Sequence, residues 1–161
     1  MANAQELKEL LDRFRSGPGN LERSIDGLSE AQLEYRPAPG KWSIREIILH
    51  LCDSEIAAAY RIRCAIGDDN PTLTTYDQDK WAARLNYGKR SIHNAVELFR
   101  MLRKSTAELF VDMDDSIWDR SAIHPERGQI TVAELIRLYS EHCDNYVAQI
   151  RKIKLLLSQQ E

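Results

Sequence analysis

The sequence predicts an all-α fold: a four-helix bundle with long irregular connections. Three observations predict it. Apolar residues recur at helical spacing in four long segments, and capping-box patterns stand where several of these segments begin. No run of alternating apolar and polar residues is long enough for a sheet. The chain has 161 residues, the size of one ordinary domain, so we expect a single helical-bundle domain over residues 1–161.

The first half of the chain is expected to form two long helices and a short one. The first helical segment covers about residues 3–27, and Gly17-Pro18-Gly19 interrupts it, which indicates a kinked helix or two helices in tandem. Ser29 to Gln32 has the form of a capping box and begins a short helix. Ser43 to Glu46 is a second capping box, and the helix that it begins ends near residues 67–71.

The second half is expected to add two more long helices. A loop with a short helix around residues 78–84 comes first, and Ser91 then caps a helix whose apolar stripe reaches Met113. Residues 114–129 are predicted to be irregular. Thr131 to Glu134 is a third capping box, and the last helix continues to about residue 157. The connections at 67–90 and 114–130 are long enough to cover an end of the bundle or to cross it.

Composition excludes several classes of function. Hydrophobic residues make up 43% of the chain and charged residues 29%, which is typical of a soluble globular protein. No apolar run approaches the roughly 20 residues of a membrane span, so we expect no membrane partner. A net charge of −3 without a basic stripe argues against a nucleic-acid partner. Three cysteines without a CxxC pair predict a reducing compartment and a cytoplasmic location.

Two of the four histidines lie deep within long helices. His50 follows a run of aliphatic residues, and His142 shares one helix face with Tyr139 and Tyr146. A histidine on the inner face of a bundle must be hydrogen-bonded or must bind something, because an unpaired buried polar group is costly. The residues alone leave two interpretations open: a metal site, or a pair of hydrogen-bonded core histidines. His93 is expected at the surface, and His124 is expected to be structural.

The order and spacing of several motifs resemble a known family, the DinB-like (DinB/YfiT) superfamily. The similar segments are Gly40-Lys41-Trp42-Ser43-Ile44-Arg45-Glu46-Ile47, His50-Leu51-Cys52-Asp53-Ser54-Glu55, Tyr76-Asp77-Gln78-Asp79-Lys80-Trp81, His124-Pro125-Glu126-Arg127-Gly128, and Glu141-His142 leading to Gln149-Ile150. The resemblance covers about residues 5–155.

The resemblance implies a four-helix bundle, a homodimer, and a pocket at one end of the bundle. It also implies a divalent metal (Zn, Ni or Mn) held by three histidines. His50 and His142 match two of these positions, and Tyr146 stands where the third histidine is expected. The implied metal positions are therefore His50, His142 and Tyr146, and with only two imidazoles the metal is expected to be weakly bound or absent. Tyr146 is left with three roles: a phenolate ligand, a hydrogen-bond donor to the metal's water, or a donor that replaces the metal.

Other side chains near these positions could take part. Asp53, one turn after His50, could orient that imidazole, add an oxygen ligand to the metal, or be a solvated or salt-bridged residue. Gln149 is expected to line the pocket or to pack between helices. Arg61 and Arg63 lie about 200° apart on one helix, so at most one of them faces the pocket, where it could bind an anionic substrate.

The sequence leaves two functions open. The first is an enzyme acting on a small molecule, a metal-dependent thiol S-transferase or hydrolase in which no catalytic residue is assigned. The alternative is a non-catalytic, metal-free, stress-associated binding module with a degenerate site. When the metal content is measured, we expect the result that the alternative function implies. The protein should be metal-free, and it should gain an ion when Tyr146 is replaced by histidine.

Overall fold

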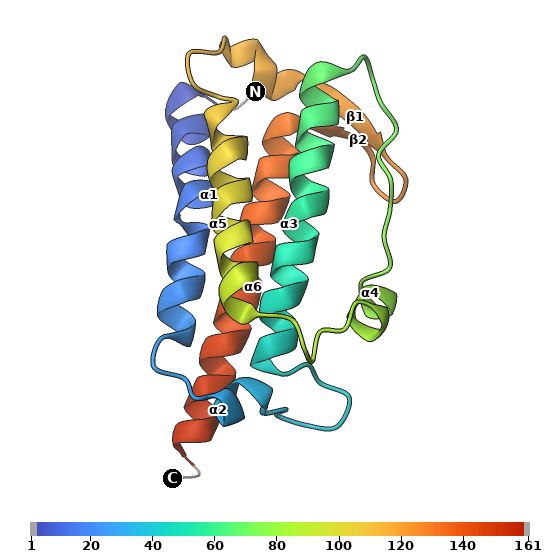
Figure 1. The fold of residues 1–161 in the computed structure, drawn as a ribbon. Helices are drawn as coiled ribbons and strands as arrows, with labels where there is room; N and C mark the ends of the chain where they lie inside the picture. Colours follow the sequence, from blue (N-terminus) through green and yellow to red (C-terminus); the bar gives the residue numbers. More distant parts are fainter. Residues whose placement is uncertain (1–2, 160–161) are drawn as a thin grey trace.

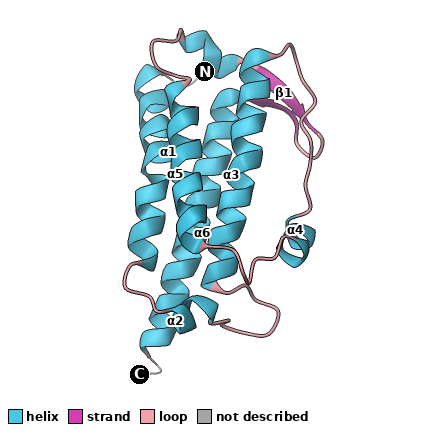
Figure 2. Ribbon diagram, in the orientation of Figure 1, coloured by secondary structure: helices cyan, strands magenta, loops and turns pink. Residues whose placement is uncertain are grey.

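A computed structural model describes residues 3–159, and within them four long helices form the predicted bundle (Figures 1 and 2). The long helices are α1 (Ala4–Ile25), α3 (Ile44–Gly67), α5 (Ile92–Glu108) and α6 (Val132–Ser158). Two short helices, α2 (Glu30–Glu34) and α4 (Gln78–Arg84), lie in the connections. The prediction of an all-α four-helix bundle is confirmed.

The chain takes an indirect path through the bundle. α1 and α3 each pack against both α5 and α6, so the four helices form a ring. α3 and α5 run in the same direction, because the segment of residues 68–91 leads the chain back along the outside of the bundle (Figure 1). This crossover segment, which carries α4, places residues 72–78 beside α3.

Side-chain caps begin the helices at the positions that the sequence indicates. Ser29, Ser43 and Thr131 each accept from the backbone N–H three residues later, and a Gln or Glu side chain reaches back to each cap. Ser91 accepts from the N–H of Asn94. Because these contacts are local in sequence, they could be predicted without any knowledge of the tertiary structure.

α1 is one helix and not two in tandem, although Pro18 lies inside it. Proline has no N–H, so the carbonyl of Phe14 loses its partner within the helix. Nη1 of Arg103, on α5, donates to that carbonyl at 2.8 Å. Gly17 makes this approach possible, since a Cβ at this position would lie 2.5 Å from Nη1. The interruption in the sequence is therefore compensated by a side chain from another helix.

Two sequence predictions for residues 109–131 are wrong. α5 ends at Glu108, five residues before the end of its apolar stripe. The stretch predicted to be irregular contains a 3₁₀ helix (Asp115–Asp119) and an antiparallel ribbon of β1 (Ser121–His124) and β2 (Gly128–Thr131). Each strand has only four residues, too few for an alternating pattern to be recognised. The ribbon also binds the crossover segment, because the N–H of Leu73 donates to Ile123 and that of Ile123 donates to Pro71, both at 2.8 Å.

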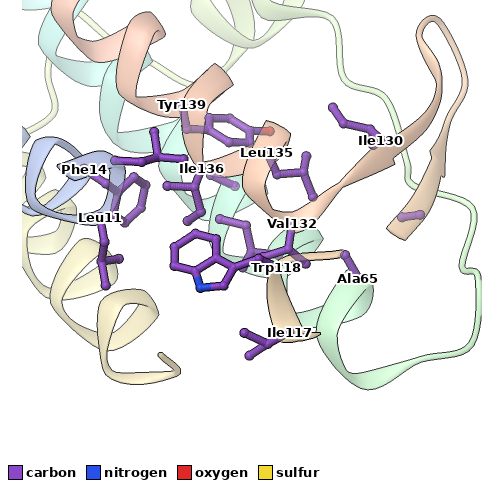
Figure 3. Packing of buried hydrophobic residues seen from close by; sticks show 14 of the residues in the cluster. Leu11, Phe14, Ala65, Ile117, Trp118, Ile130, Val132, Leu135, Ile136 and Tyr139 are labelled. Atoms are coloured by element: carbon purple, nitrogen blue, oxygen red, sulfur yellow. The ribbon is translucent and has the colours of Figure 1, made fainter. Parts of the chain in front are cut away.

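The core near the ribbon is closed by Trp118. Its indole stacks on Phe110 with the ring centroids 4.4 Å apart, and it belongs to the same buried cluster as Val132 and Ile136 of α6 (Figure 3). Trp118 thus anchors the 3₁₀ segment to the bundle. No helix among residues 3–159 is long and apolar enough to cross a membrane.

Candidate functional site

His50 of α3 and His142 of α6 meet inside the bundle. The two Nε2 atoms lie 3.1 Å apart, and the ring planes are inclined by 61°. His50 is almost completely buried, with 1% of its surface exposed. The two helices are neighbours in the bundle, and this packing brings together two residues that are 92 positions apart in the sequence.

Tyr146 and Trp42 complete an aromatic enclosure around the two imidazoles. The Tyr146 ring lies one turn after His142, and its centroid is 4.9 Å from each imidazole centroid. Trp42 lies 4.9 Å from His50 and stacks on Tyr146 at 6.2 Å. The structure therefore brings together His50, His142 and Tyr146. Within residues 3–159 the Tyr146 hydroxyl has no hydrogen-bond partner, so the phenol does not replace a metal by bonding to either histidine.

Burial sets the protonation states of these three groups. It lowers the pKa of His50 to about 3, with a further contribution from His142. Burial, and then the charge of Arg103, lowers the pKa of His142 to about 4. Burial raises the pKa of the Tyr146 phenol. At neutral pH both imidazoles are neutral, and one Nε2–H donates to the lone pair of the other ring.

The described residues offer a divalent metal two imidazole nitrogens at this point and no third histidine, cysteine or carboxylate. Two imidazole nitrogens on a tetrahedral zinc ion, at about 2.0–2.1 Å, lie roughly 3.3 Å apart, close to the 3.1 Å between the Nε2 atoms. Each neutral imidazole has one lone pair, and the ring that donates its Nε2–H would have to carry that proton on Nδ1 before its Nε2 could act as a ligand. No group of three His, Cys, Asp or Glu side chains suited to a metal exists in the part of the chain that the structure describes. Tyr146 is the remaining side chain of the predicted set, and because burial raises the pKa of its phenol it is a poor ligand at neutral pH.

The other polar side chains for which the sequence suggests a role lie in different environments. Both oxygens of Asp53 accept from Arg90, at 2.7 and 2.8 Å, so this carboxylate is in a buried ion pair and is not free to serve as a ligand. Gln149 lines a pocket of about 240 Å³ together with Trp42 and Tyr146. His93 is exposed, as expected. His124 is buried, and its Nδ1 accepts from the N–H of Glu126 at 3.2 Å.

A second and larger cavity, of about 320 Å³, adjoins His142 on the side of the β ribbon. Three parts of the chain line it: the bundle helices, the crossover segment and the ribbon. The lining residues are Ser54, Arg61, Thr75, Tyr76, Gln78, His124, Glu126, Arg127, Leu138 and His142. The Ser54 and Tyr76 hydroxyls are hydrogen-bonded at 2.7 Å.

Most of this lining was not predicted from the sequence. Ser54 lies four residues after His50 and Arg61 lies eleven after it, so helical spacing alone could have placed both on the same face as His50. Of the two arginines weighed in the sequence, Arg61 lines the cavity, while Arg63 points to Ser105 and Thr106. Tyr76 and His124 stand in segments that carry the family resemblance, but helical spacing could not have placed them in this cavity, because their positions depend on the path of the crossover segment and the ribbon.

Comparisons with known proteins agree with this architecture. A protein of Oceanobacillus iheyensis named "Putative metal-dependent hydrolase" is 29% identical over 147 residues, which cover 91% of this chain and 85% of the relative. A Bacillus mycoides protein of the same name is 27% identical over 150 residues, 93% of this chain and 82% of the relative.

Solved structures show the same fold. YfiT from Bacillus subtilis, reported as "a probable metal-dependent hydrolase with an unusual four-helix bundle topology", superposes with a TM-score of 0.91 at 19% identity, over 98% of this chain and 91% of YfiT. A mycothiol-dependent maleylpyruvate isomerase superposes with a TM-score of 0.70 at 14% identity, over 89% of this chain and 60% of the isomerase. The model of the DinB superfamily matches residues 13–150. Because this match spans most of the sequence, the chain belongs to the DinB superfamily.

Proposed function

We propose that this protein is a metal-dependent enzyme acting on a small molecule, as a hydrolase or a thiol S-transferase. His50 and His142 hold a divalent metal in this proposal, and Tyr146 occupies the third corner. The observation that carries it is the 3.1 Å separation of two Nε2 atoms that belong to neutral imidazoles. The names of the relatives and of the mycothiol-dependent neighbour support the reaction class.

The chemistry divides between the metal and the chain. A bound zinc, nickel or manganese ion supplies a Lewis acid that lowers the pKa of a water or thiol and so provides a nucleophile near neutral pH. His50 and His142 stay neutral because they are buried, so each can offer its Nε2 lone pair to a metal once the Nε2–H that they share has moved to Nδ1 of the donating ring. Trp42 covers one side of the His50 imidazole and shields it from water. The Tyr146 hydroxyl stays protonated and can donate a hydrogen bond to the substrate.

A second candidate function is a metal-free binding module. Tyr146 favours it, because a phenol whose pKa is raised by burial is a poor metal ligand at neutral pH. Two imidazoles that already share one hydrogen bond are stable without an ion. In this case the pocket would bind its small molecule without chemical change.

Metal titration of protein produced without a histidine tag tests the proposal. Zinc, nickel and manganese are each added to the wild type and to His50→Ala, with His93→Ala as the control, since His93 is an exposed histidine outside the site. Protein purified without added metal is still expected to be metal-free, but at high metal concentration we expect one weakly bound ion per chain that is lost in His50→Ala and kept in His93→Ala.

Tyr146→His restores a third imidazole and is the sharper variant. The free energy of zinc binding at a structural site with four ligands is about 10–16 kcal/mol, or roughly 2.5–4 kcal/mol per ligand. One added imidazole is therefore expected to raise the affinity for zinc roughly 100-fold. Wild-type protein that binds no ion on titration, while Tyr146→His binds one, would establish the metal-free module. An ion that binds equally well to His50→Ala would place any metal elsewhere.

A further inference from the structure

Arg61 is a buried cation without a carboxylate partner. Its side chain lines the 320 Å³ cavity beside His142, and the residue is only 6% exposed. Nε donates to the carbonyl of Thr74 at 3.1 Å, Nη2 donates to the same carbonyl, and Nη1 donates to the Tyr139 hydroxyl at 2.8 Å. The guanidinium also lies over the Tyr76 ring, at 5.4 Å from its centroid. All of these partners are neutral.

The other buried arginines of the described chain are paired with acids. Arg103 donates to Glu55 at 3.0 Å, and Arg45 contacts both Glu30 and Glu34. An unpaired charge in the interior is costly, and proteins commonly retain one only where something supplies the opposite charge. Arg61, the buried arginine of the described chain that has no acidic partner, lines a cavity large enough for a small molecule.

The guanidinium has the hydrogen-bonding capacity for an anion. It carries five N–H groups, and three of them are used by Thr74 and Tyr139. One N–H remains free on each of Nη1 and Nη2. A carboxylate in a bidentate pair accepts two hydrogen bonds from an arginine, so these two N–H groups are enough to bind one.

The cavity lining is positive although the chain as a whole is negative. Arg127 also lines the cavity and forms no ion pair within residues 3–159. Glu126 is the one carboxylate of the lining, so two guanidinium groups face a single acid, against a net charge of −3 for the whole chain. The two histidines of the lining contribute no charge at neutral pH, because burial lowers the pKa of both His124 and His142.

We propose that this cavity binds a small carboxylate, most favourably a short dicarboxylate that contacts Arg61 with one end and Arg127 with the other. Arg61 is the principal binding residue, and the paired hydroxyls of Ser54 and Tyr76 lie beside it to orient the ligand. The inference rests on the proposed function, because His142 belongs to both sites. It gives that function a substrate class: small organic acids.

Succinate is the probe, and succinamide, which has nearly the same shape without the charges, is its control. Binding is measured by calorimetry on the full chain after metal ions have been removed with a chelator and the chelator has been dialysed away, so that neither a metal nor a competing polycarboxylate is present. Arg61→Met is compared with Arg63→Met, which removes an exposed arginine two residues away that points to another part of the protein. We expect succinate to bind the wild type and Arg63→Met alike, to bind Arg61→Met at least about tenfold more weakly, and succinamide not to bind.

A second variant covers the case in which Arg61→Met does not fold, since Arg61 also holds Thr74. Arg127→Gln changes an exposed residue and is expected to weaken succinate binding several-fold. Succinate is also expected to shift the NMR resonances of the His142 ring and to leave those of the exposed His93 ring unchanged.

Three results would overturn the inference. The first is that succinate fails to bind the wild type at concentrations up to about 20 mM. The second is that succinate and succinamide bind equally well, and the third is that inorganic phosphate binds more tightly than succinate. The metal titration is independent of these measurements. Succinate binding without any metal binding would overturn the proposed enzyme and leave the carboxylate site standing, whereas metal binding without succinate binding would do the reverse.

Discussion

Burial decides the state of the two site histidines at the scale of single residues. The imidazoles lie in the middle of two helices, where Trp42 and Tyr146 cover His50 and Tyr146 also packs against His142. Loss of solvation penalises the charged form, which lowers the pKa of His50 to about 3 and that of His142 to about 4. Two neutral rings can share a hydrogen bond or a metal, whereas two imidazolium rings at 3.1 Å would repel each other.

These shifts predict a dependence of stability on pH. In the unfolded chain both histidines take up protons below about pH 6.5, while the folded protein resists protonation until about pH 4 and 3. The free energy of unfolding contributed by the two neutral histidines is therefore complete above pH 6.5. It falls as the pH decreases toward 4, by up to about 1.4 kcal/mol per pH unit for each histidine.

Urea denaturation of the metal-free protein between pH 5 and 7.5 measures this effect. His50→Gln should flatten the profile, and His93→Gln should leave its slope unchanged because His93 is exposed. Parallel profiles for the wild type and His50→Gln would show that His50 does not carry the dependence.

At the scale of elements, α1 depends on a contact from α5. Pro18 leaves the Phe14 carbonyl without a helical partner, and Nη1 of Arg103 supplies one. The same guanidinium donates to Glu55 and to the carbonyl of Tyr139, so it joins α1, α3 and α6 at one point. The absence of a side chain at Gly17 creates the space for it.

Two glycines of α1 are expected to respond to alanine in opposite directions. A Cβ at Gly17 would lie 2.5 Å from Nη1 of Arg103, so Gly17→Ala displaces a buried guanidinium and should destabilise the protein by about 1–3 kcal/mol. A Cβ at Gly19 would meet only the flexible side chain of Arg23, at 3.3 Å. Gly19→Ala should stabilise the helix by about 0.5–1 kcal/mol.

Thermal or urea unfolding of the two variants provides the measurement, with each serving as the control for the other. Stabilisation by Gly17→Ala would mean that Arg103 can move away without loss.

The path of the whole chain determines which residues share the larger cavity. α3 and α5 are parallel, so the crossover segment must return along the outside of the bundle (Figure 1). It is held to the β ribbon by backbone hydrogen bonds on both sides of Thr72, from Ile123 to Pro71 and from Leu73 to Ile123. This connection brings Tyr76 next to Ser54 and closes one wall of the cavity.

Breaking this connection should loosen the crossover segment while leaving the bundle intact. Ile123→Pro removes the N–H that donates to Pro71, whereas Ile123→Val preserves it. Hydrogen exchange measured by mass spectrometry should be roughly 2- to 10-fold faster over residues 72–77 in the proline variant, the effect of one lost hydrogen bond. Equal acceleration in α6 would show that the ribbon supports the whole bundle and not the crossover segment alone.

The sequence by itself determined the helices and the identity of the paired residues. Helical periodicity and capping boxes are local, so α3 and α6 could be predicted to within one or two residues. Spacing of four placed His142 and Tyr146 on one face, and the family resemblance joined His50 to them. The prediction that metal binding is weak or absent stays a prediction until ions are titrated.

Only the tertiary structure decided how these elements are used. It assigned Asp53 to Arg90, let α1 continue through Pro18, and built the β ribbon from two strands too short to recognise. It also left Arg61 buried without an acid, at a cavity that three separate parts of the chain enclose. The physical reason is the same in each case: caps and periodicity act over a few residues, whereas a hydrogen-bond partner for a buried group comes from wherever packing places one, often tens of residues away.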